Sequence, residues 1–415
     1  MEKALLVGII LGKENKKDIY DQLIELEQLA NTAGANSLST VFQHRKKPDP
    51  ATYIGKGKLA TILNQAKALN CSLIIFNNDI SPSQIKNIQK EAGEFMKVMD
   101  RTGLILDIFT KHAKTKEAKT QVELAHLEYL LPRLTRQWTH LERQMGGIGT
   151  RAGAGETQIE VDRRLIRNHI IRLKKELKKI EKQRFVQNQT RKSAYTIALV
   201  GYTNAGKSSI MRMLTGSDIF IEDKLFATLD TTTRKLDLNS GQNVIISDTV
   251  GFIRNLPFHL VASFRSTLGE IQNVDLLIKV FDASSENLQI HIDTVNNVLH
   301  DLKLSSKSSL LLFNKIDLIK DSHELEGLKN RYSNCYFTSA ITKGEEKKLI
   351  NKIKDIATSE FVNETFQISY KQSKILDTIY ALSHVLKKKE DYNGIKLEVE
   401  GNKESIEKIR NIINQ

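Results

Sequence analysis

The sequence predicts an α/β multidomain protein, and three observations support this fold class. Short apolar segments alternate with amphipathic ones through residues 1–100 and again from Tyr195 onward, a spacing typical of βα units in a mostly parallel sheet. Two long amphipathic stretches lie between these regions. A chain of 415 residues is also too long for one ordinary core. We expect an N-terminal α/β subdomain (1–112), a helical hairpin (113–193), a second α/β domain (194–360) and a small C-terminal α/β domain (361–415).

The N-terminal subdomain should contain four strands and three helices. The strands are expected at Leu5–Ile10, Leu38–Gln43, Ser72–Phe76 and Lys97–Met99. The helices are expected between them, at Lys17–Thr32, Lys58–Leu69 and Ser83–Ala92. The stretch YIGKGK (Tyr53–Lys58) lacks a complete phosphate-loop pattern, so we interpret it as a strand-to-helix turn.

The hairpin should be formed by two long helices. The first is expected from Lys116 to Arg143 with a kink at Pro132, because apolar residues recur there on one helical face. The second is expected from Thr157 to Gln187, because its isoleucines and leucines follow a heptad-like spacing and Thr157 opens a capping box. Two such helices joined by a short loop form an antiparallel hairpin.

A glycine-rich loop, MGGIGTRAGAGETQ (145–158), forms the tip of this hairpin. It holds five of the 22 glycines but lacks the Lys-Ser/Thr ending of a nucleotide triphosphate loop. Its residues of interest are Gly146, Gly147, Gly149, Arg151, Gly153 and Gly155. An ordinary flexible turn is the alternative interpretation.

Composition favours a polyanionic partner and a reducing compartment. Lys and Arg number 62 against 49 Asp and Glu, a net charge of +13, and nine of the cations lie between Arg172 and Lys192 with only two acids. Such a run indicates either RNA contact or a solvated helix face. The cysteines Cys71 and Cys335 cannot form a disulfide framework, and no apolar run approaches 18 residues. We expect a cytoplasmic protein without a membrane span.

The C-terminal domain should have the order strand, helix, strand, helix. The strands are expected at Phe366–Tyr370 and Ile395–Glu400. The helices are expected at Ser373–Lys388 and Lys403–Ile413.

A phosphate-loop motif opens the domain that begins near Tyr195. The apolar strand Thr196–Val200 precedes GYTNAGKS, which matches the pattern GxxxxGK[ST] and consists of Gly201, Tyr202, Thr203, Asn204, Ala205, Gly206, Lys207 and Ser208. Glycines let backbone N–H groups face phosphates, and the helix N-terminus adds a favourable potential. We expect Lys207 to reach the β- and γ-phosphates and Ser208 to ligate Mg²⁺.

Two further strands carry the residues of a Mg²⁺ and γ-phosphate site. VIISDTVGF places Asp248, Thr249, Val250 and Gly251 after an apolar segment. Asp248 fits the Mg²⁺ carboxylate, and the Gly251 N–H can sense the γ-phosphate. In LFATLD, the segment Phe226, Ala227, Thr228, Leu229 and Asp230, the best candidate to close over Mg²⁺ is Thr228, with Thr231–Thr233 as rivals.

The remaining motifs select guanine and complete a P-loop G domain. SLLLFNKID ends in Asn314, Lys315, Ile316 and Asp317, and CYFTSA supplies Ser339 and Ala340, followed by Ile341. Asp317 can accept the N1–H and N2–H₂ groups of guanine, which adenine does not offer. Lys315 can lie along the purine, Asn314 can brace the base site, and a backbone N–H near Ala340 can meet guanine O6.

At this point the chain resembles the HflX GTPases, translational GTPases that bind the large ribosomal subunit. Besides the nucleotide motifs, the resemblance rests on YIGKGK, DRTGLILDIF (100–109), AKTQVELAHLEYLLPRL (118–134), GGIGTR (146–151), GETQIEVDRR (155–164), LFATLD and DTVGFI. One departure is at the tip, where Ala-Gly-Ala-Gly follows Arg151 in place of the family's Gly-Pro-Gly. That leaves the tip's detailed contacts open.

The resemblance implies a function. Family members split stalled or idle 70S ribosomes, with GTP gating binding to the 50S subunit and hydrolysis releasing the factor. The glycine tip is then a probe of the peptidyl-transferase region, with Arg151 offered to RNA. We expect a monomer with GTP and Mg²⁺ as cofactors.

The residue after Gly251 bears on hydrolysis. Phe252 cannot orient the attacking water as glutamine does in many small GTPases, so hydrolysis should be slow without the large subunit. Lys207, Thr228 and Gly251 are the expected catalytic groups, and Asn204 is a candidate K⁺ ligand. Two other functions stay open: a guanine-nucleotide-gated RNA-binding scaffold and an ATP-dependent RNA remodeller.

Overall fold

The computed structural model describes most of the chain. The described residues are 2–12, 14–134, 158–189, 194–217, 222, 224–238, 244–256, 271–272, 274–332, 335–359, 361–372, 375–392 and 394–413. The glycine tip, from Gly146 to Gly155, lies outside them. The chain forms two compact units, one comprising Met1–Ile180, Asp223–Leu229 and Asn255–Arg265, and the other comprising Glu181–Glu222, Asp230–Arg254 and Ser266–Gln415.

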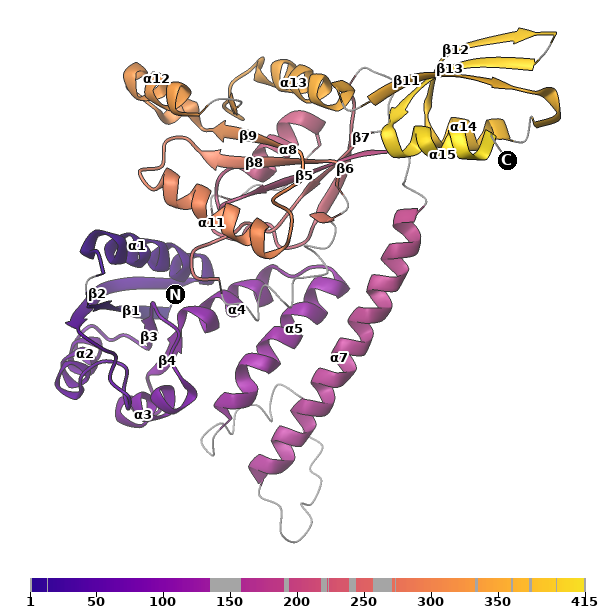
Figure 1. Cartoon of the computed structure of the whole chain (residues 1–415). Coiled ribbons are helices and arrows are strands. Elements are labelled where there is room, and N and C mark those ends of the chain that lie inside the picture. Colours follow the sequence, from indigo (N-terminus) through magenta and orange to yellow (C-terminus); the bar gives the residue numbers. More distant parts are fainter. Residues whose placement is uncertain are drawn as a thin grey trace. The chain divides into compact units, whose positions relative to one another are not determined.

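The first unit begins with a parallel four-stranded sheet in the order β2-β1-β3-β4. The strands are β1 (Glu2–Leu11), β2 (Ala35–Arg45), β3 (Leu73–Phe76) and β4 (Lys97–Asp100), and the helices are α1 (Lys16–Ala33), α2 (Lys56–Ala68) and α3 (Pro82–Ala92). Figure 1 shows α1 on one face of this sheet and α2 and α3 on the other. On the α1 face, a Cβ at Gly8 would lie 2.9 Å from Leu23 Cδ1, so glycine permits the close packing of helix and strand.

The helices that follow differ in part from the sequence prediction. Helix α4 (Arg101–His112) was not predicted. Helix α5 (Lys116–Leu130) ends before Pro132, and the rest of the predicted helix, from residue 135 to Arg143, lies outside the described residues. A 3-10 turn, η1 (Leu131–Arg133), follows α5 and contains Pro132, which cannot donate to a continuing helix. The long helix α7 (Gln158–Gln189) lies close to its predicted bounds.

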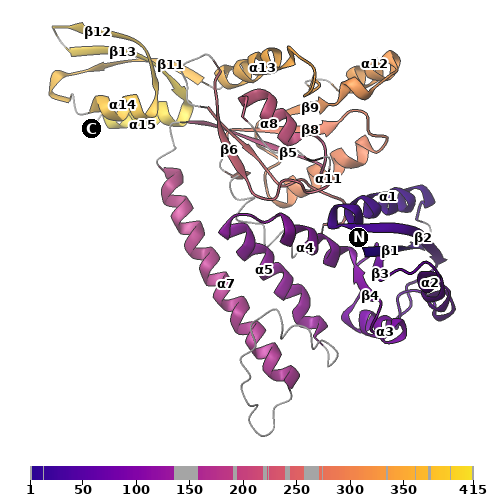
Figure 2. The same cartoon turned by 180° about the vertical axis from the view of Figure 1, so that it is seen from behind.

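Helices α5 and α7 run side by side in both views of the molecule (Figure 2). Their shared seam is a cluster of buried leucines and isoleucines, to which Leu134 after η1 also contributes: Leu124, Leu127, Leu134, Ile166, Ile170, Leu173 and Leu177. Two ion pairs join the same helices, Lys116–Glu176 at 2.8 Å and Lys174–Glu128 at 2.7 Å. The heptad-like spacing in α7 therefore corresponds to a real packing seam.

The second unit contains a six-stranded sheet in the order β10-β9-β8-β5-β7-β6. Its strands are β5 (Tyr195–Gly201), β6 (Thr232–Leu236), β7 (Val244–Asp248), β8 (Leu276–Asp282), β9 (Ser309–Asn314) and β10 (Cys335–Phe337). All pairs are parallel except β6 with β7. The helices of this domain are α8 (Lys207–Thr215), α11 (Leu288–Asp301), α12 (Ser322–Arg331) and α13 (Glu345–Ser359), with the turn η2 (Ile316–Leu318).

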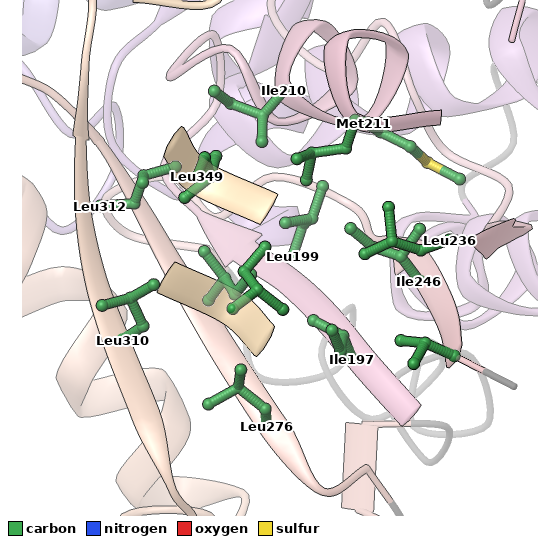
Figure 3. Packing of buried hydrophobic residues seen from close by; sticks show 14 of the residues in the cluster. Ile197, Leu199, Ile210, Met211, Leu236, Ile246, Leu276, Leu310, Leu312 and Leu349 are labelled. Atoms are coloured by element: carbon green, nitrogen blue, oxygen red, sulfur yellow. The ribbon is translucent and has the colours of Figure 1, made fainter. Parts of the chain in front are cut away.

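One face of this sheet is sealed by α8 and α13. Ile210 and Met211 of α8 and Leu349 of α13 pack onto strand residues such as Leu199 and Ile246 (Figure 3). All five side chains are fully buried. Burial of this apolar surface stabilises the sheet, and the ends of its strands carry the site residues described below.

The C-terminal elements form an antiparallel three-stranded sheet, β11-β13-β12. They are β11 (Phe361–Ile368), the turn η3 (Tyr370–Gln372), α14 (Ile375–Leu382), β12 (His384–Asp391), β13 (Gly394–Asn402) and α15 (Lys403–Ile413). The prediction of one helix over Ser373–Lys388 is wrong, because its second half is strand β12, paired with β13. Cross-strand pairing overrides local helix propensity there.

The boundaries of the four predicted domains stay a prediction. Among the described helices, none is long and apolar enough to cross a membrane.

Candidate nucleotide site

The predicted nucleotide residues follow the carboxyl ends of neighbouring strands in one sheet. The P-loop follows β5, Asp248 ends β7, Asn314 ends β9, and Ser339 follows β10. The strands β10, β9, β8, β5 and β7 are parallel, so these ends share one edge of the sheet. Open α/β sheets bind ligands at that edge.

The P-loop backbone is held close to its neighbours by glycine. A Cβ at Gly201 would lie 2.1 Å from the Val280 carbonyl oxygen, and one at Gly206 would lie 2.2 Å from Asn314 Nδ2. Gly206 also has φ +90°, and Asn204 has φ 59°. Glycine avoids these close contacts, and the left-handed backbone at Asn204 and Gly206 permits the tight turn of the loop.

Lys207 is oriented by its own loop. Its buried ammonium donates to the carbonyl oxygens of Tyr202 (2.9 Å) and Gly201 (3.3 Å). Burial lowers the pKa of Lys207 to about 8, against the attraction of Asp248. An ammonium has three N–H donors, so these two bonds leave one for a phosphate oxygen.

Ser208 and Asp248 are brought together as the sequence predicted for a metal site. The Ser208 hydroxyl donates to Asp248 Oδ2 over 2.6 Å. Asp248 is fully buried at the end of β7, and Thr249 beside it donates to the Leu199 carbonyl over 2.7 Å. A hydroxyl and a carboxylate next to a phosphate-binding loop are the hard oxygen ligands that Mg²⁺ takes, so the residues present fit that ion.

On the side of the site where the sequence predicts base binding, called the base side below, Asn314 joins the P-loop to the segment after β10. Asn314 Nδ2 donates to the Ala205 carbonyl (3.0 Å), and Asn314 Oδ1 accepts from the Ala340 N–H (3.1 Å). Asn314 therefore connects the P-loop to the segment after β10, while its role in bracing a bound base stays a prediction. The hydroxyls of Thr338 and Ser339 are buried there without a hydrogen-bond partner in the described part of the chain.

Lys315 is positioned by a residue that the sequence analysis missed. Its backbone is left-handed (φ 64°), and its ammonium lies 2.8 Å from Asp282 Oδ2 at the end of β8. Asp282 Oδ1 accepts from the N–H (3.0 Å) and hydroxyl (2.6 Å) of Ser284. Asp317 is exposed in η2 (Ile316–Leu318), and its contact with a base stays a prediction. Asp282 directly follows the largely apolar segment Leu276–Phe281, and this position at the end of a strand is the sequence signal that could have found it.

The segment that contains Thr228, called the switch segment below, belongs to the first compact unit and not to the one that holds the P-loop. Lys224–Leu229 belongs to the first unit, and Phe226, with φ 57°, packs edge-on against Phe109 of α4 at 4.8 Å between ring centroids. Thr228 and Ala227 are half-buried beside it. The rivals Thr232 and Thr233 lie in β6, where Thr232 pairs with Asp248 and Thr233 with Ser247.

Three family models match consecutive parts of the chain. They are described as GTP-binding GTPase N-terminal (residues 20–110), GTP-binding GTPase Middle Region (112–191) and 50S ribosome-binding GTPase (196–315). A crystal structure of a GTP-binding protein from the archaeon Sulfolobus solfataricus in complex with GDP is 27% identical, with a TM-score of 0.44, and covers 86% of this chain and 99% of that chain.

Curated relatives extend the match over nearly the whole chain. GTPase HflX of Caldanaerobacter subterraneus is 42% identical over 99% of this chain and 94% of its own. The Escherichia coli protein of that name is 39% identical over 95% and 92%, and that of Flavobacterium psychrophilum 48% over 77% and 76%.

The family models and the curated relatives define a P-loop GTPase, an enzyme that hydrolyses GTP with Mg²⁺ as such enzymes generally do. Within that class, the chain belongs to the GTPase HflX family, and its G domain is of the ribosome-binding type. The resemblance seen in the sequence is thereby confirmed.

Proposed function

We propose that this GTPase binds the large (50S) ribosomal subunit and splits stalled or idle 70S ribosomes. GTP gates binding, and hydrolysis is linked to release. The observation that carries the proposal is the match of residues 196–315 to a model described as a 50S ribosome-binding GTPase.

The charge on α7 supports an RNA partner. Its buried seam packs on α5, while Arg172, Lys175, Lys178, Lys179 and Lys182 are exposed. Cations concentrated along one exposed helix surface attract RNA phosphates with a salt-sensitive affinity. The glycine tip, with Arg151, would then enter an RNA pocket; its residues lie outside the described part of the chain.

Within the G domain, each group has a proposed role. Lys207 binds the β- and γ-phosphates, Ser208 and Asp248 hold Mg²⁺ with Thr228, and the Gly251 N–H contacts the γ-phosphate. Mg²⁺ supplies charge neutralisation of the phosphate oxygens. Asp317 selects guanine, and Asn204, exposed at the mouth of the P-loop, is proposed as a K⁺ ligand. A rate of hydrolysis that is equal in K⁺ and Na⁺ would remove that last role.

Sedimentation of 70S ribosomes tests the proposal. With the protein and a non-hydrolysable GTP analogue, we expect 70S particles to separate into subunits, with the protein in the 50S fraction. GDP should not support this, and neither should the Lys207→Ala variant. Ribosomes that stay intact at saturating protein would contradict the splitting function.

The probe role of the tip has its own test. Replacing Gly146–Gly155 by a short Gly-Ser turn should leave GTP affinity and intrinsic hydrolysis nearly intact, because the nucleotide residues begin at Gly201. Splitting should be lost, and Arg151→Ala should weaken it less. Splitting at the parental rate by the shortened protein would show the tip to be an ordinary turn.

A further inference from the structure

The segment after β7 is tied to the P-loop through its backbone. Phe252 N–H donates to the Gly201 carbonyl (3.0 Å), and Thr203 N–H donates to the Phe252 carbonyl (2.8 Å), so Tyr202 and Phe252 form a parallel bridge. The Phe252 side chain is only 2% exposed. A side chain buried in this way is turned into the protein, so the segment acts on the nucleotide through its main chain.

Gly251 lies directly against the phosphate-binding groups. A Cβ at this position would lie 2.8 Å from Thr203 Cα and 3.0 Å from Lys207 Nζ. The Gly251 main chain therefore stands beside the lysine that holds the β- and γ-phosphates. Its N–H can meet the γ-phosphate only if the segment that carries it keeps this position.

Tyr202 contacts this segment a second time, through its side chain. The Tyr202 hydroxyl accepts a hydrogen bond from the Arg254 N–H over 2.9 Å. Since Gly251 and Phe252 precede Arg254, the segment is held at both ends, by the P-loop backbone at Gly201 and Thr203 and by the tyrosine hydroxyl at Arg254.

The tyrosine ring is itself fixed by helix α11. The rings of Tyr202 and His291 stack with centroids 3.9 Å apart and an interplanar angle of 18°, and Tyr202 is 4% exposed. Burial, and then the nearby Arg254 charge, lower the pKa of His291 to about 4, so the imidazole is neutral near neutral pH. Neutral stacked rings pack without a buried charge. The P-loop, the segment after β7 and α11 thus meet at Tyr202.

We propose that Tyr202 is a positioning residue for GTP hydrolysis: its hydroxyl and its stacked ring hold Gly251–Arg254 so that the Gly251 N–H is directed at the γ-phosphate. The inference rests on the role proposed for Gly251 and is independent of ribosome splitting. This role differs from that of the glutamine that orients the attacking water in many small GTPases, because the tyrosine acts on a main-chain donor to the γ-phosphate. A tyrosine that only filled space would affect stability and nucleotide affinity instead.

Tyr202→Phe separates the two interpretations, because it removes the hydroxyl acceptor and keeps the ring. Single-turnover hydrolysis of GTP by the full chain without ribosomes should slow about three- to tenfold, the effect of losing one hydrogen bond in the reacting geometry. The Kd values for GTP and GDP should not change. Tyr332→Phe is the matched control, since it also removes a tyrosine hydroxyl bond in the G domain, to Gln289 over 2.8 Å. It should hydrolyse at the parental rate.

A second pair of variants tests the ring. His291→Ala removes the stacking partner and should slow hydrolysis, whereas His291→Phe restores an aromatic face and should recover most of the rate. The proposal is overturned if Tyr202→Phe hydrolyses at the parental rate, or if its Kd for GTP rises while the rate at saturation is unchanged. Equal rates for His291→Ala and His291→Phe would show that the stack does not position the tyrosine. None of these outcomes depends on ribosomes, so a failure here is distinct from a failure to split 70S particles.

Discussion

The base side and the switch side of the nucleotide site are held in different ways. On the base side, Asn314 joins Ala205 to Ala340, and Asp282 fixes Lys315, all within one compact unit. On the switch side, Thr228 belongs to the other compact unit, which also holds Phe226 and Phe109.

This difference indicates which part of the nucleotide site is held by its own domain and which part depends on a segment of the other unit. The contacts of Asn314 and Lys315 lie within the G domain itself. The position of Thr228 depends on a segment anchored by Phe226 on Phe109. We therefore expect base-side variants to change nucleotide affinity, and switch-side variants to change hydrolysis at nearly constant affinity.

The largest effect is expected from Asp317→Asn, which breaks the base side. The amide replaces two acceptors with one acceptor and one donor, so guanine loses a charged partner. GTP affinity should fall about 100-fold or more, and xanthosine nucleotides, with the reversed pattern at C2, should bind better. Calorimetry with both nucleotides measures this. Unchanged GTP affinity would show that Asp317 does not read the base.

Thr228→Ala breaks the switch side. Because Thr228 is proposed to close over Mg²⁺ only in the triphosphate state, GDP affinity should stay constant. Hydrolysis at limiting Mg²⁺ should slow about 10- to 100-fold, the effect of losing one interaction with a charged group. Thr231→Ala is the matched control from the same loop. If Thr231→Ala slows hydrolysis and Thr228→Ala does not, the metal role moves to Thr231.

The pH dependence of GTP affinity tests the role of Lys207, which binds phosphate rather than the base or the switch segment. Burial lowers the pKa of Lys207 to about 8, and only the charged form attracts phosphate. The ammonium is therefore present below that pKa and is lost as pH rises through it. GTP affinity should fall about tenfold per pH unit above about pH 8, the limiting slope for one required proton. Lys207→Arg should bind more weakly but without this slope, since arginine stays protonated. A parental affinity that is flat up to about pH 9.5 would contradict the lowered pKa.

The sequence predicted the residues that belong to local motifs at the ends of apolar strands. The P-loop, Asp248 and Asn314 each follow an apolar strand, and strand-end topology alone brings them to one edge. Asp282 and His291 were missed because neither belongs to a motif. Each acts through a neighbour on another element, Lys315 after β9 and Tyr202 after β5.

The errors in the fold have the same origin. Residues Ser373–Lys388 have a helical pattern, yet their second half pairs with β13, a long-range contact that no local pattern reveals. Helix α5 ends at Leu130, just before the 3-10 turn η1 that contains Pro132, where a kink was predicted; the predicted residues from 135 to Arg143 lie outside the described part of the chain.

The smallest effect is expected from Asp282→Asn, which sharpens the base side. Asp282 and Lys315 are each about a quarter exposed or less, so their ion pair contributes about 1 kcal/mol, near the upper end for surface pairs. Asparagine keeps an oxygen acceptor for Ser284 and loses only the charge that holds the lysine stem beside the purine. Dissociation of a fluorescent GDP should therefore speed up about three- to sixfold, with hydrolysis of bound GTP unchanged. The matched control is Asp293→Asn. Asp293 is an exposed residue of α11 whose carboxylate accepts a hydrogen bond from Gln289, and its variant should release GDP at the parental rate. If the two variants release GDP equally fast, the Asp282–Lys315 pair does not position the base. Of the contacts described for the base side, only those of Asn314 would then remain as candidates for holding it in place.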